Sequence, residues 1–236
     1  MSRAAAIVPA AGRGARIGFK TPKTFIDLGG VPLLARTLAA IAASRRIAVV
    51  QPVLPRTHLA LFASRILARH RWERCLPAVA GGRERQDSVA AGLRALPEDI
   101  DIVLIHDGAR PFVTTALVER VLAEARRHGA AIAALPVPDT VKRVSPDLFV
   151  AETVERRTLW LAQTPQAFQV NLLREAHARA RAAGLEATDD AALVEALGHP
   201  VRVVPGSRMN FKVTTREDLA LARALVGSLP PERGRR

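Results

Sequence analysis

Residues 4–18 read AAAIVPAAGRGARIG, an apolar run of strand length that passes directly into a turn of small residues. The small residues at positions 10, 11, 12 and 14 let backbone N–H groups approach a bound group closely. The loop after a first strand lies at the carboxyl end of the sheet, which is where open α/β sheets bind their ligands. This stretch therefore predicts a buried first strand followed by a ligand-binding loop.

Short apolar runs alternate with amphipathic stretches along the rest of the chain, and this alternation is typical of βαβ units on a mostly parallel sheet. We expect strands at Ala4–Pro9, Ile47–Leu54, Cys75–Ala80, Asp101–His106, Ala130–Pro136, Leu159–Gln163 and Val201–Val204. From the spacing of apolar residues we expect helices at Pro32–Ala43, His58–His70, Gln86–Leu96, Thr115–His128, Leu172–Ala183, Asp189–Leu197 and Thr215–Val226. The sequence thus predicts an α/β fold, with a single Rossmann-like three-layer domain at residues 1–228 and a disordered tail at residues 229–236.

Two helix ends carry recognisable signals. Thr214 followed by Glu217 is a capping-box pattern, which predicts the start of the last helix. Gly129 follows a run of basic residues and predicts the end of the helix at Thr115–His128.

Residues 138–157 break the alternation. Two β-like runs, at Val141–Val144 and Phe149–Val154, flank a turn at Ser145–Asp147. A two-stranded hairpin inserted between parallel strands cannot bury both of its faces on its own domain. We therefore expect a protruding β-hairpin dimerisation arm that packs against a second subunit, so that a homodimer is the expected assembly. A solvent-covered excursion of the same sheet is the alternative.

The composition indicates ample material for a core and a strongly basic balance. Hydrophobic residues make up 49% of the 236 residues, and 35 Lys+Arg against 22 Asp+Glu give a net charge of +13. That charge would suit nucleic acid, but the basic residues are scattered along predicted helix faces. Aromatic content is only 4% with no Tyr, so a base-stacking surface is poorly supplied. We expect no nucleic-acid partner.

A single cysteine and the lack of a long apolar run indicate the cellular environment. Cys75 cannot form an internal disulfide, which excludes disulfide scaffolds and cysteine-based zinc sites. No apolar stretch approaches the roughly 18–20 residues that a membrane span requires, and the opening residues lack the pattern of a signal peptide. We expect a cytoplasmic protein with no membrane partner.

Two basic side chains, Arg16 and Lys23, belong to the loop after the first strand. Together with the amide groups of the loop they form an expected cradle for a polyphosphate. Two common phosphate motifs are excluded. Ile17 stands where the dinucleotide fingerprint needs its third glycine, and residues 18–21 (GFKT) lack the Gly-Lys-Thr adjacency of a P-loop.

Six further motifs follow this loop in order along the chain. They are residues 81–88 (GGRERQDS), 106–111 (HDGARP), 138–142 (PDTVK), 164–166 (TPQ), 188–190 (TDD) and 210–214 (NFKVT). With the first loop and its Pro-Lys pair, the set resembles the 2-C-methyl-D-erythritol 4-phosphate cytidylyltransferase family of sugar-phosphate nucleotidyltransferases, from about Ala4 to Leu225. One departure is Thr24, where the family usually has Gln after Pro-Lys.

The resemblance implies roles for individual residues. The implied catalytic residues are Arg16 and Lys23. Those implied at the nucleotide are Ala10, Ala11, Gly12, Gly14, Arg16, Lys23, Gly82, Ser88, Asp107 and Ala109. Those implied at the second substrate are Arg110, Thr140, Arg156, Thr188 and Lys212. Thr140 and Arg156 would reach the neighbouring subunit's site from the arm, whereas Arg157 is expected to be an ordinary surface charge. Asp107 is the expected metal residue, directly or through a water.

Several of these residues also have a structural interpretation. Ser88 could cap the adjacent helix. Asp107 ends an apolar strand, where a buried carboxylate is costly unless it meets a cation. We expect Asp107 near the metal-triphosphate and ribose rather than in an internal pair with Arg110. Lys212 lies in an expected strand at Phe211–Val213, and in an arginine-rich chain a lysine there is interpreted as a compact point charge for the substrate.

The implied reaction transfers CMP from CTP to 2-C-methyl-D-erythritol 4-phosphate and releases pyrophosphate, on the non-mevalonate route to isoprenoid precursors. A phosphate monoester has a second pKa of about 6, so at pH 7 it can attack without a general base. Arg16, Lys23 and a divalent cation, with Mg²⁺ expected, would neutralise the transition state, while Arg156 and Lys212 position the attacking phosphate. A ribitol- or other polyol-phosphate cytidylyltransferase is the alternative within the class. A nucleotide- or RNA-binding module is the alternative outside it.

Overall fold

The computed structural model describes residues 3–11, 22–70 and 72–228. The expected disordered tail at residues 229–236 lies outside these ranges, as do the loop residues Gly12, Gly14 and Arg16.

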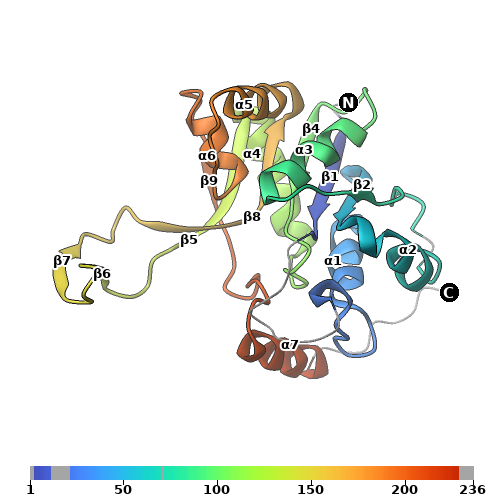
Figure 1. Cartoon of the computed structure of the whole chain (residues 1–236), viewed down its shortest axis with the longest axis horizontal. Coiled ribbons are helices and arrows are strands. Elements are labelled where there is room, and N and C mark those ends of the chain that lie inside the picture. Colours follow the sequence, from blue (N-terminus) through green and yellow to red (C-terminus); the bar gives the residue numbers. More distant parts are fainter. Residues whose placement is uncertain (1–2, 12–21, 71, 229–236) are drawn as a thin grey trace.

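A seven-stranded sheet runs through the middle of the molecule in the order β3-β2-β1-β4-β8-β5-β9 (Figure 1). Its strands are β1 (Ala4–Pro9), β2 (Ile47–Leu54), β3 (Val79–Ala80), β4 (Ile102–Ile105), β5 (Ala130–Pro136), β8 (Trp160–Gln169) and β9 (Arg202–Pro205). Neighbours pair in parallel except at β8, which is antiparallel to both β4 and β5. The predicted α/β fold with a mostly parallel sheet is confirmed.

Helices cover both faces of the sheet and make three layers. The longer ones are α1 (Leu33–Ala42), α3 (Arg85–Ala95), α4 (Thr115–His128), α5 (Val170–Ala182) and α7 (Arg216–Ser228), with a shorter α6 (Asp190–Glu195). Successive side chains of a strand point to opposite faces. Ala6 and Val8 of β1 therefore join a core with α1 and α4, whereas Ala5 and Ile7 join a second core with α3, α5 and α6.

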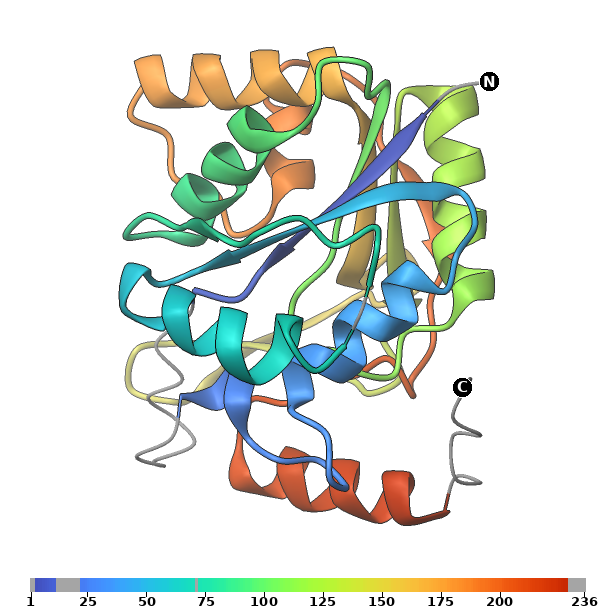
Figure 2. The ribbon, with the colours of Figure 1, turned by 90° about the vertical axis from the view of Figure 1, so that its right-hand side faces the viewer.

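Helix α7 lies outside these layers, beneath α1 in the view of Figure 2. Leu219 and Ala222 of α7 pack against Leu28, Leu33 and Val213, so the last helix closes over the segment that leads into α1. Within the described ranges, no helix is long and apolar enough to cross a membrane.

Two expected elements are shorter or more broken than predicted. Instead of a strand at Cys75–Ala80, an isolated bridge joins Cys75 to Val50 and only β3 forms, because Pro77 has no N–H to donate to a ladder. The expected helix at His58–His70 divides into a 3-10 turn at Arg56–His58, a short α2 (Leu59–Phe62) and a π-helical turn at Ala63–Leu67.

Strand β8 is longer than its expected span of Leu159–Gln163. It continues to Gln169 because Gln166 and Phe168 pair with β4 on one side and with β5 on the other. The motif at residues 164–166 therefore lies inside the sheet, and the strand that carries it runs against its neighbours.

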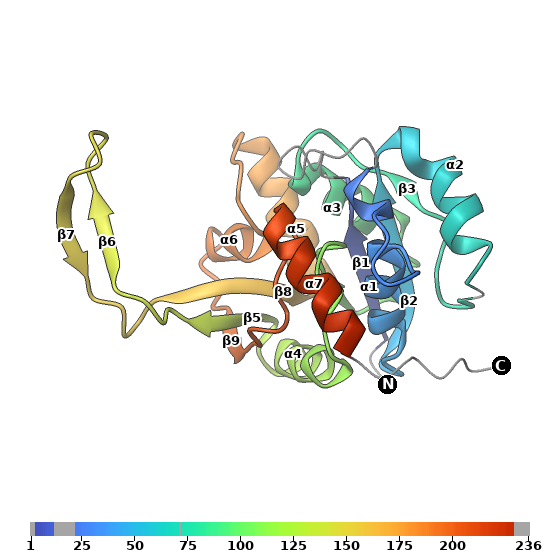
Figure 3. The same ribbon diagram turned by 90° about the horizontal axis from the view of Figure 1, so that it is seen from below.

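Residues 138–157 form the expected hairpin, made of β6 (Val141–Val144) and β7 (Val150–Val154). Figure 3 shows it projecting from the end of the β5 and β8 strands as a separate sheet. Its tip exposes Leu148 and Phe149, which are 82% and 75% accessible. Its role in dimerisation stays a prediction.

The two expected helix ends have different outcomes. Gly129, at φ 84°, donates its N–H to Ala125 and ends α4 as predicted. The expected capping box at Thr214 and Glu217 is wrong by one residue. The Asp218 carboxylate accepts from the Thr215 N–H at 2.9 Å, and the Thr215 hydroxyl accepts from the Asp218 N–H at 3.2 Å. An aspartate thus closes the box one position further along.

This cap gives a test of the fold. Asp218→Ala removes an acceptor that also binds the N–H and the hydroxyl of Thr214, at 2.7 and 2.6 Å. We expect it to lower the free energy of unfolding by about 1 kcal/mol. Glu217→Ala is the matched control and should change the melting temperature little. An equal or larger effect at Glu217 would contradict this assignment of the cap.

Candidate active site

Three loops of small residues meet at the carboxyl ends of β1, β3 and β4. A Cβ added to Gly108, after β4, would lie 3.0 Å from the Cβ of Ala10, after β1. A Cβ added to Gly81, after β3, would lie 2.9 Å from the Cβ of Ala11. Because glycine is needed for this approach, the sequence pattern and the packing agree. The structure therefore brings Ala10 and Ala11 beside the loops that carry the next two motifs.

Gly82 and Ser88 lie at the start of α3. Glu84 is the N-cap, and its own N–H donates to Asp87 at 3.1 Å. The Ser88 hydroxyl donates to the Glu84 carbonyl at 3.1 Å from inside the first turns of the helix. The interpretation of Ser88 as a cap is therefore wrong. Its hydroxyl lies under the loop, 2.6 Å from the position that a Cβ of Gly81 would take, and its role at the nucleotide stays a prediction.

Asp107 follows β4 directly and is the centre of a group of charges. Its carboxylate lies 2.8 Å from Lys212 Nζ, 3.4 Å from Arg85 Nε and 3.7 Å from Arg110 Nε. The side chain is only 10% exposed, and the backbone N–H donates to the Thr164 hydroxyl at 3.0 Å. Asp107 does make an internal pair with Arg110, contrary to our expectation. A carboxylate at this depth requires such cations, whether or not it also contacts a ligand.

The charges fix the protonation states of the group. Burial alone would raise the pKa of Asp107, but the positive charges of Lys212, Arg85 and Arg110 hold it well below its usual range. Burial lowers the pKa of Arg110, and the charge of Asp107 offsets part of this effect. Burial also lowers the pKa of His106 to about 4, so this histidine is neutral near pH 7.

His106 is a structural residue. It is fully buried, with Nδ1 3.1 Å from the Thr164 hydroxyl and Nε2 3.2 Å from the Arg110 carbonyl. These contacts hold the strand β8 and the loop after β4 in register with each other.

The loop at residues 207–214 carries Lys212 to Asp107. It is an extended loop rather than the expected strand at Phe211–Val213. The Val213 N–H donates to the Ala109 carbonyl at 2.9 Å, and Arg110 Nη1 donates to the Asn210 carbonyl at 2.7 Å. Lys212 and Arg110 both lie beside Asp107. Lys212, at 39% exposure, is the more accessible of these two cations.

Thr188 lies on the exposed loop before α6. Gln86 of α3 ties this loop down, because its Nε2 donates to the Leu185 carbonyl at 3.2 Å and its Oε1 accepts from the Ala187 N–H at 3.2 Å. The Thr188 loop is therefore fixed to the helix that begins beside Gly82.

Lys23 begins a 3-10 turn at Lys23–Phe25 and is half-buried. Thr24, the departure from the family pattern, is 6% exposed inside this turn. The catalytic role expected of Lys23 stays a prediction, and the roles of Gly12, Gly14 and Arg16 concern residues outside the described ranges.

Figure 1 shows the hairpin of β6 and β7 projecting away from the rest of the molecule. Thr140 lies just before β6, and Arg156 lies just after β7. Both are exposed. Arg156 donates to the Pro138 carbonyl, and Arg157 pairs with Glu155 at 3.1 Å. Within one chain, the structure does not bring the two arm residues to the rest of the site.

The surroundings of Asp107 do not fit a magnesium ion held by the protein. Mg²⁺ binds through carboxylates with free oxygens and retains several waters. Both oxygens of Asp107 already face cations. In the part of the chain that the structure describes, no group of three His, Cys, Asp or Glu side chains could hold a metal ion.

Two residues of the site were not selected from the sequence. Arg85 and Asp190 belong to motifs that were noted, but the expected roles fell on their neighbours Gly82 and Thr188. Their ion pair, at 2.7 Å, joins positions that are 105 residues apart. The available signal was an arginine in the motif at residues 81–88 and an aspartate in the motif at residues 188–190. Opposite charges in two motifs do not show that the two residues pair.

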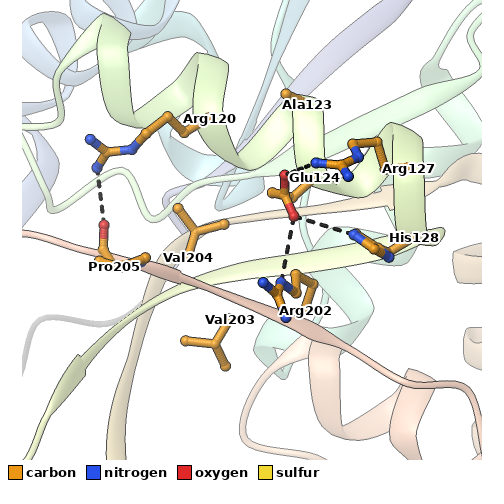
Figure 4. Close-up of a pocket in the computed structure, with 9 residues that line it drawn as sticks. All are labelled: Arg120, Ala123, Glu124, Arg127, His128, Arg202, Val203, Val204 and Pro205. Atoms are coloured by element: carbon orange, nitrogen blue, oxygen red, sulfur yellow. Dashed lines mark hydrogen bonds and ion pairs between the residues drawn. The ribbon is translucent and has the colours of Figure 1, made fainter.

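A groove of about 470 Å³ lies elsewhere, between α4 and the edge strand β9 (Figure 4). Its centre is Glu124, whose carboxylate contacts Arg127 at 3.2 Å, His128 at 3.3 Å and Arg202 at 3.5 Å. No residue expected at the site lines this groove. We interpret it as a surface ion-pair cluster.

Comparison with known proteins identifies the family of the chain. The family model for IspD, 2-C-methyl-D-erythritol 4-phosphate cytidylyltransferase, matches residues 4–228. The enzyme of that name from Syntrophus aciditrophicus (strain SB) is 45% identical over 221 residues, which are 94% of this chain and 94% of the relative.

Solved structures give the same answer. The 4-diphosphocytidyl-2C-methyl-D-erythritol synthase from Anaerococcus prevotii has a TM-score of 0.85 at 31% identity, over 96% of each chain. The 2-C-methyl-D-erythritol 4-phosphate cytidylyltransferase from Thermus thermophilus has a TM-score of 0.77 at 44% identity, over 96% of this chain and 100% of that one. The chain therefore belongs to the IspD family of 2-C-methyl-D-erythritol 4-phosphate cytidylyltransferases.

Proposed function

We propose that the side chains gathered at the carboxyl ends of β1, β3 and β4 carry out the transfer for which the family is named. An oxygen of 2-C-methyl-D-erythritol 4-phosphate attacks the α-phosphorus of CTP. The bond from that phosphorus to the oxygen bridging to the β-phosphorus breaks, and pyrophosphate leaves. The observation that carries the proposal is the cluster of Lys212, Arg85 and Arg110 around buried Asp107, beside loops of small residues, in a member of this family.

The attacking group needs no base, because a phosphate monoester with a second pKa of about 6 is largely dianionic at pH 7. The neutral, fully buried His106 is consistent with this, since it is engaged on both ring nitrogens. What the reaction needs is positive charge close to the phosphates as negative charge accumulates in the transition state.

The cation cluster has donors available for that purpose. In the described part of the chain, Arg85 Nη2 is buried without a hydrogen-bond partner, and Arg110 Nε is buried with the Asp107 carboxylate 3.7 Å away, beyond hydrogen-bond distance. A buried unpaired donor is costly, and an anionic ligand would satisfy it. We assign Lys212 and Arg110 to the attacking phosphate, with Thr188 at the edge of the same substrate.

The nucleotide would lie across the small-residue loops. Backbone groups of residues 10–14 and 81–88 would recognise cytosine, while Arg16 and Lys23 contact the triphosphate. A divalent cation would enter with the triphosphate of CTP, since Asp107 is already balanced by cations. The assignment of Asp107 to the ribose remains part of this proposal.

The hairpin would complete the site of a second copy of the chain. Its exposed apolar side chains, including Leu148 at 82%, Phe149 at 75% and Val150 at 61%, are unusual for a surface that meets only water. An isolated two-stranded hairpin is at best marginally stable in water. We propose a homodimer in which Thr140 and Arg156 act in trans.

The reaction itself is tested by pyrophosphate release. Release from CTP should require 2-C-methyl-D-erythritol 4-phosphate, whereas release that ribitol 5-phosphate supports equally well would favour the polyol-phosphate alternative. Tight RNA binding without any release would favour a binding module instead.

Lys23→Ala tests the transition-state role of the first loop. We expect kcat to fall roughly 10²–10³-fold while CTP affinity changes little, because a contact made mainly in the transition state is lost. Steady-state kinetics would check this. An unchanged kcat with a raised KM for CTP would instead assign Lys23 to ground-state binding.

Discrimination between CTP and UTP tests the nucleotide loops. Recognition by backbone groups of residues 10–14 and 81–88 should favour CTP. A site that hydrogen-bonds the exocyclic amino group of cytosine leaves its own polar atoms unpaired when uracil, which has an oxygen at that position, is bound. Equal kcat/KM values for UTP and CTP would contradict this placement of the base.

Arg156→Ala tests the arm against a matched neighbour. It should raise KM for 2-C-methyl-D-erythritol 4-phosphate roughly ten- to hundredfold and leave CTP affinity nearly unchanged, because a charged hydrogen bond contributes about 1.5–3 kcal/mol. Arg157→Ala is the control, since Arg157 pairs with Glu155 on the same strand end. Similar losses in both variants would argue for a general loss of arm structure.

A mixed dimer decides whether the arm acts in trans. An Arg156→Ala subunit is combined with a Lys23→Ala subunit. Activity is measured with 2-C-methyl-D-erythritol 4-phosphate well below the raised KM, where each variant is nearly inactive as a homodimer. A trans arm gives one intact site and partial recovery of activity. A verified heterodimer without recovery would reject the trans arrangement.

A further inference from the structure

We propose that Asp190 is a positioning residue, which acts through Arg85 to hold Asp107 in place. This inference rests on the proposed function for its kinetic consequence, but not for the geometry from which it starts. Asp190 is the first residue of α6, and it contacts a different nitrogen of Arg85 from the one that faces Asp107.

Arg85 joins two carboxylates that come from different parts of the chain. Its Nη1 donates to Asp190 Oδ2 at 2.7 Å, and its Nε donates to Asp107 Oδ1 at 3.4 Å. The shorter bond is to Asp190, so the guanidinium is fixed from that side. A guanidinium presents several donors in a rigid plane, which suits it to bridge two acceptors.

The orientation of Asp107 depends on contacts at both of its oxygens. Lys212 and Arg110 lie nearest Oδ2, whereas Arg85 lies nearest Oδ1. Without Arg85 at Oδ1, the carboxylate would be held at one oxygen only and could rotate toward Lys212. Asp190 therefore sets where Asp107, and with it Lys212, stands.

Asp190 is not explained by helix capping. Asp189 takes the N-cap role of α6, because its Oδ1 accepts from the Ala192 N–H at 3.0 Å. The Asp190 side chain, 1% exposed, instead contacts Arg85 and His177, with His177 Nε2 3.2 Å from Oδ1. A carboxylate buried to this depth is costly unless it is paired, so its partners are the reason for its place.

The kinetic test begins with Asp190→Asn, which keeps the shape and removes the charge. We expect kcat/KM for 2-C-methyl-D-erythritol 4-phosphate to fall about tenfold or more, a size typical of losing a group that orients a ligand-contacting residue. In an Asp107→Asn background the same change should alter the rate less than about twofold, because the group that it positions is already gone. Effects that simply multiply would overturn the inference.

Two further variants separate positioning from general stability. Val194→Ala leaves a cavity under α6, where Val194 is fully buried, without touching the charges. It should lower the melting temperature and leave kcat and KM near those of the parent. Arg85→Lys keeps a cation but cannot reach both carboxylates, so it should lose activity as Asp190→Asn does. Kinetic losses in Val194→Ala, or parental kinetics in Arg85→Lys, would each overturn the inference.

A last measurement does not depend on activity. The free energy of unfolding is measured by chemical denaturation for four proteins: the parent, Asp107→Asn, Asp190→Asn and the double variant. These four values form a double-mutant cycle for the two carboxylates that share Arg85. The double variant leaves the Arg85 guanidinium buried without a charged partner at either end, so its loss of stability should exceed the sum of the single losses. Additive losses would reject the link. Coupled losses in a protein that makes no cytidylyl product would keep the link and reject the proposed function.

Discussion

The site depends on one buried carboxylate at the end of one central strand. Asp107 cannot remain charged at 10% exposure without cations, and its three partners come from α3, from its own loop and from the loop before α7. Each of those segments therefore packs near the carboxyl end of β4, where its cation contacts Asp107. Balancing a single buried negative charge thus gathers three cationic side chains at one place.

The second constraint is steric. Gly81 and Gly108 leave no room for a Cβ against Ala11 and Ala10, so the three loops lie closer together than larger residues would allow. Close loops present backbone N–H groups rather than side chains to a ligand. Charge balance and small residues therefore act together at the carboxyl ends of β1, β3 and β4.

Much of the fold could be predicted from local sequence patterns. The predictions failed where a structure depends on contacts between residues that are far apart in the sequence. The helix Thr115–His128 was predicted at its true limits, because amphipathic spacing and a glycine stop are local signals. The direction of β8 was not predicted, since its pairing with β4 and β5 is not written in its own residues. At the site, the loops of small residues were identified from spacing and resemblance. The Arg85–Asp190 pair was missed because it joins α3 to α6 across 105 positions of the chain, and only the folded packing brings these two charges together.

Strand β8 has a mechanical consequence. The strand begins beside the hairpin at Trp160, which is 42% exposed. It continues to fully buried residues such as Ala167 and Phe168. Thr164, midway along it, bonds to both His106 and the backbone of Asp107. One strand thus connects the projecting hairpin to the buried side chains of His106 and Asp107. Between the hairpin and Thr164, residues 160–162 of β8 pair with β5. The stiffness of this short paired stretch therefore influences how far a tilt of the hairpin is transmitted to the Asp107 carboxylate.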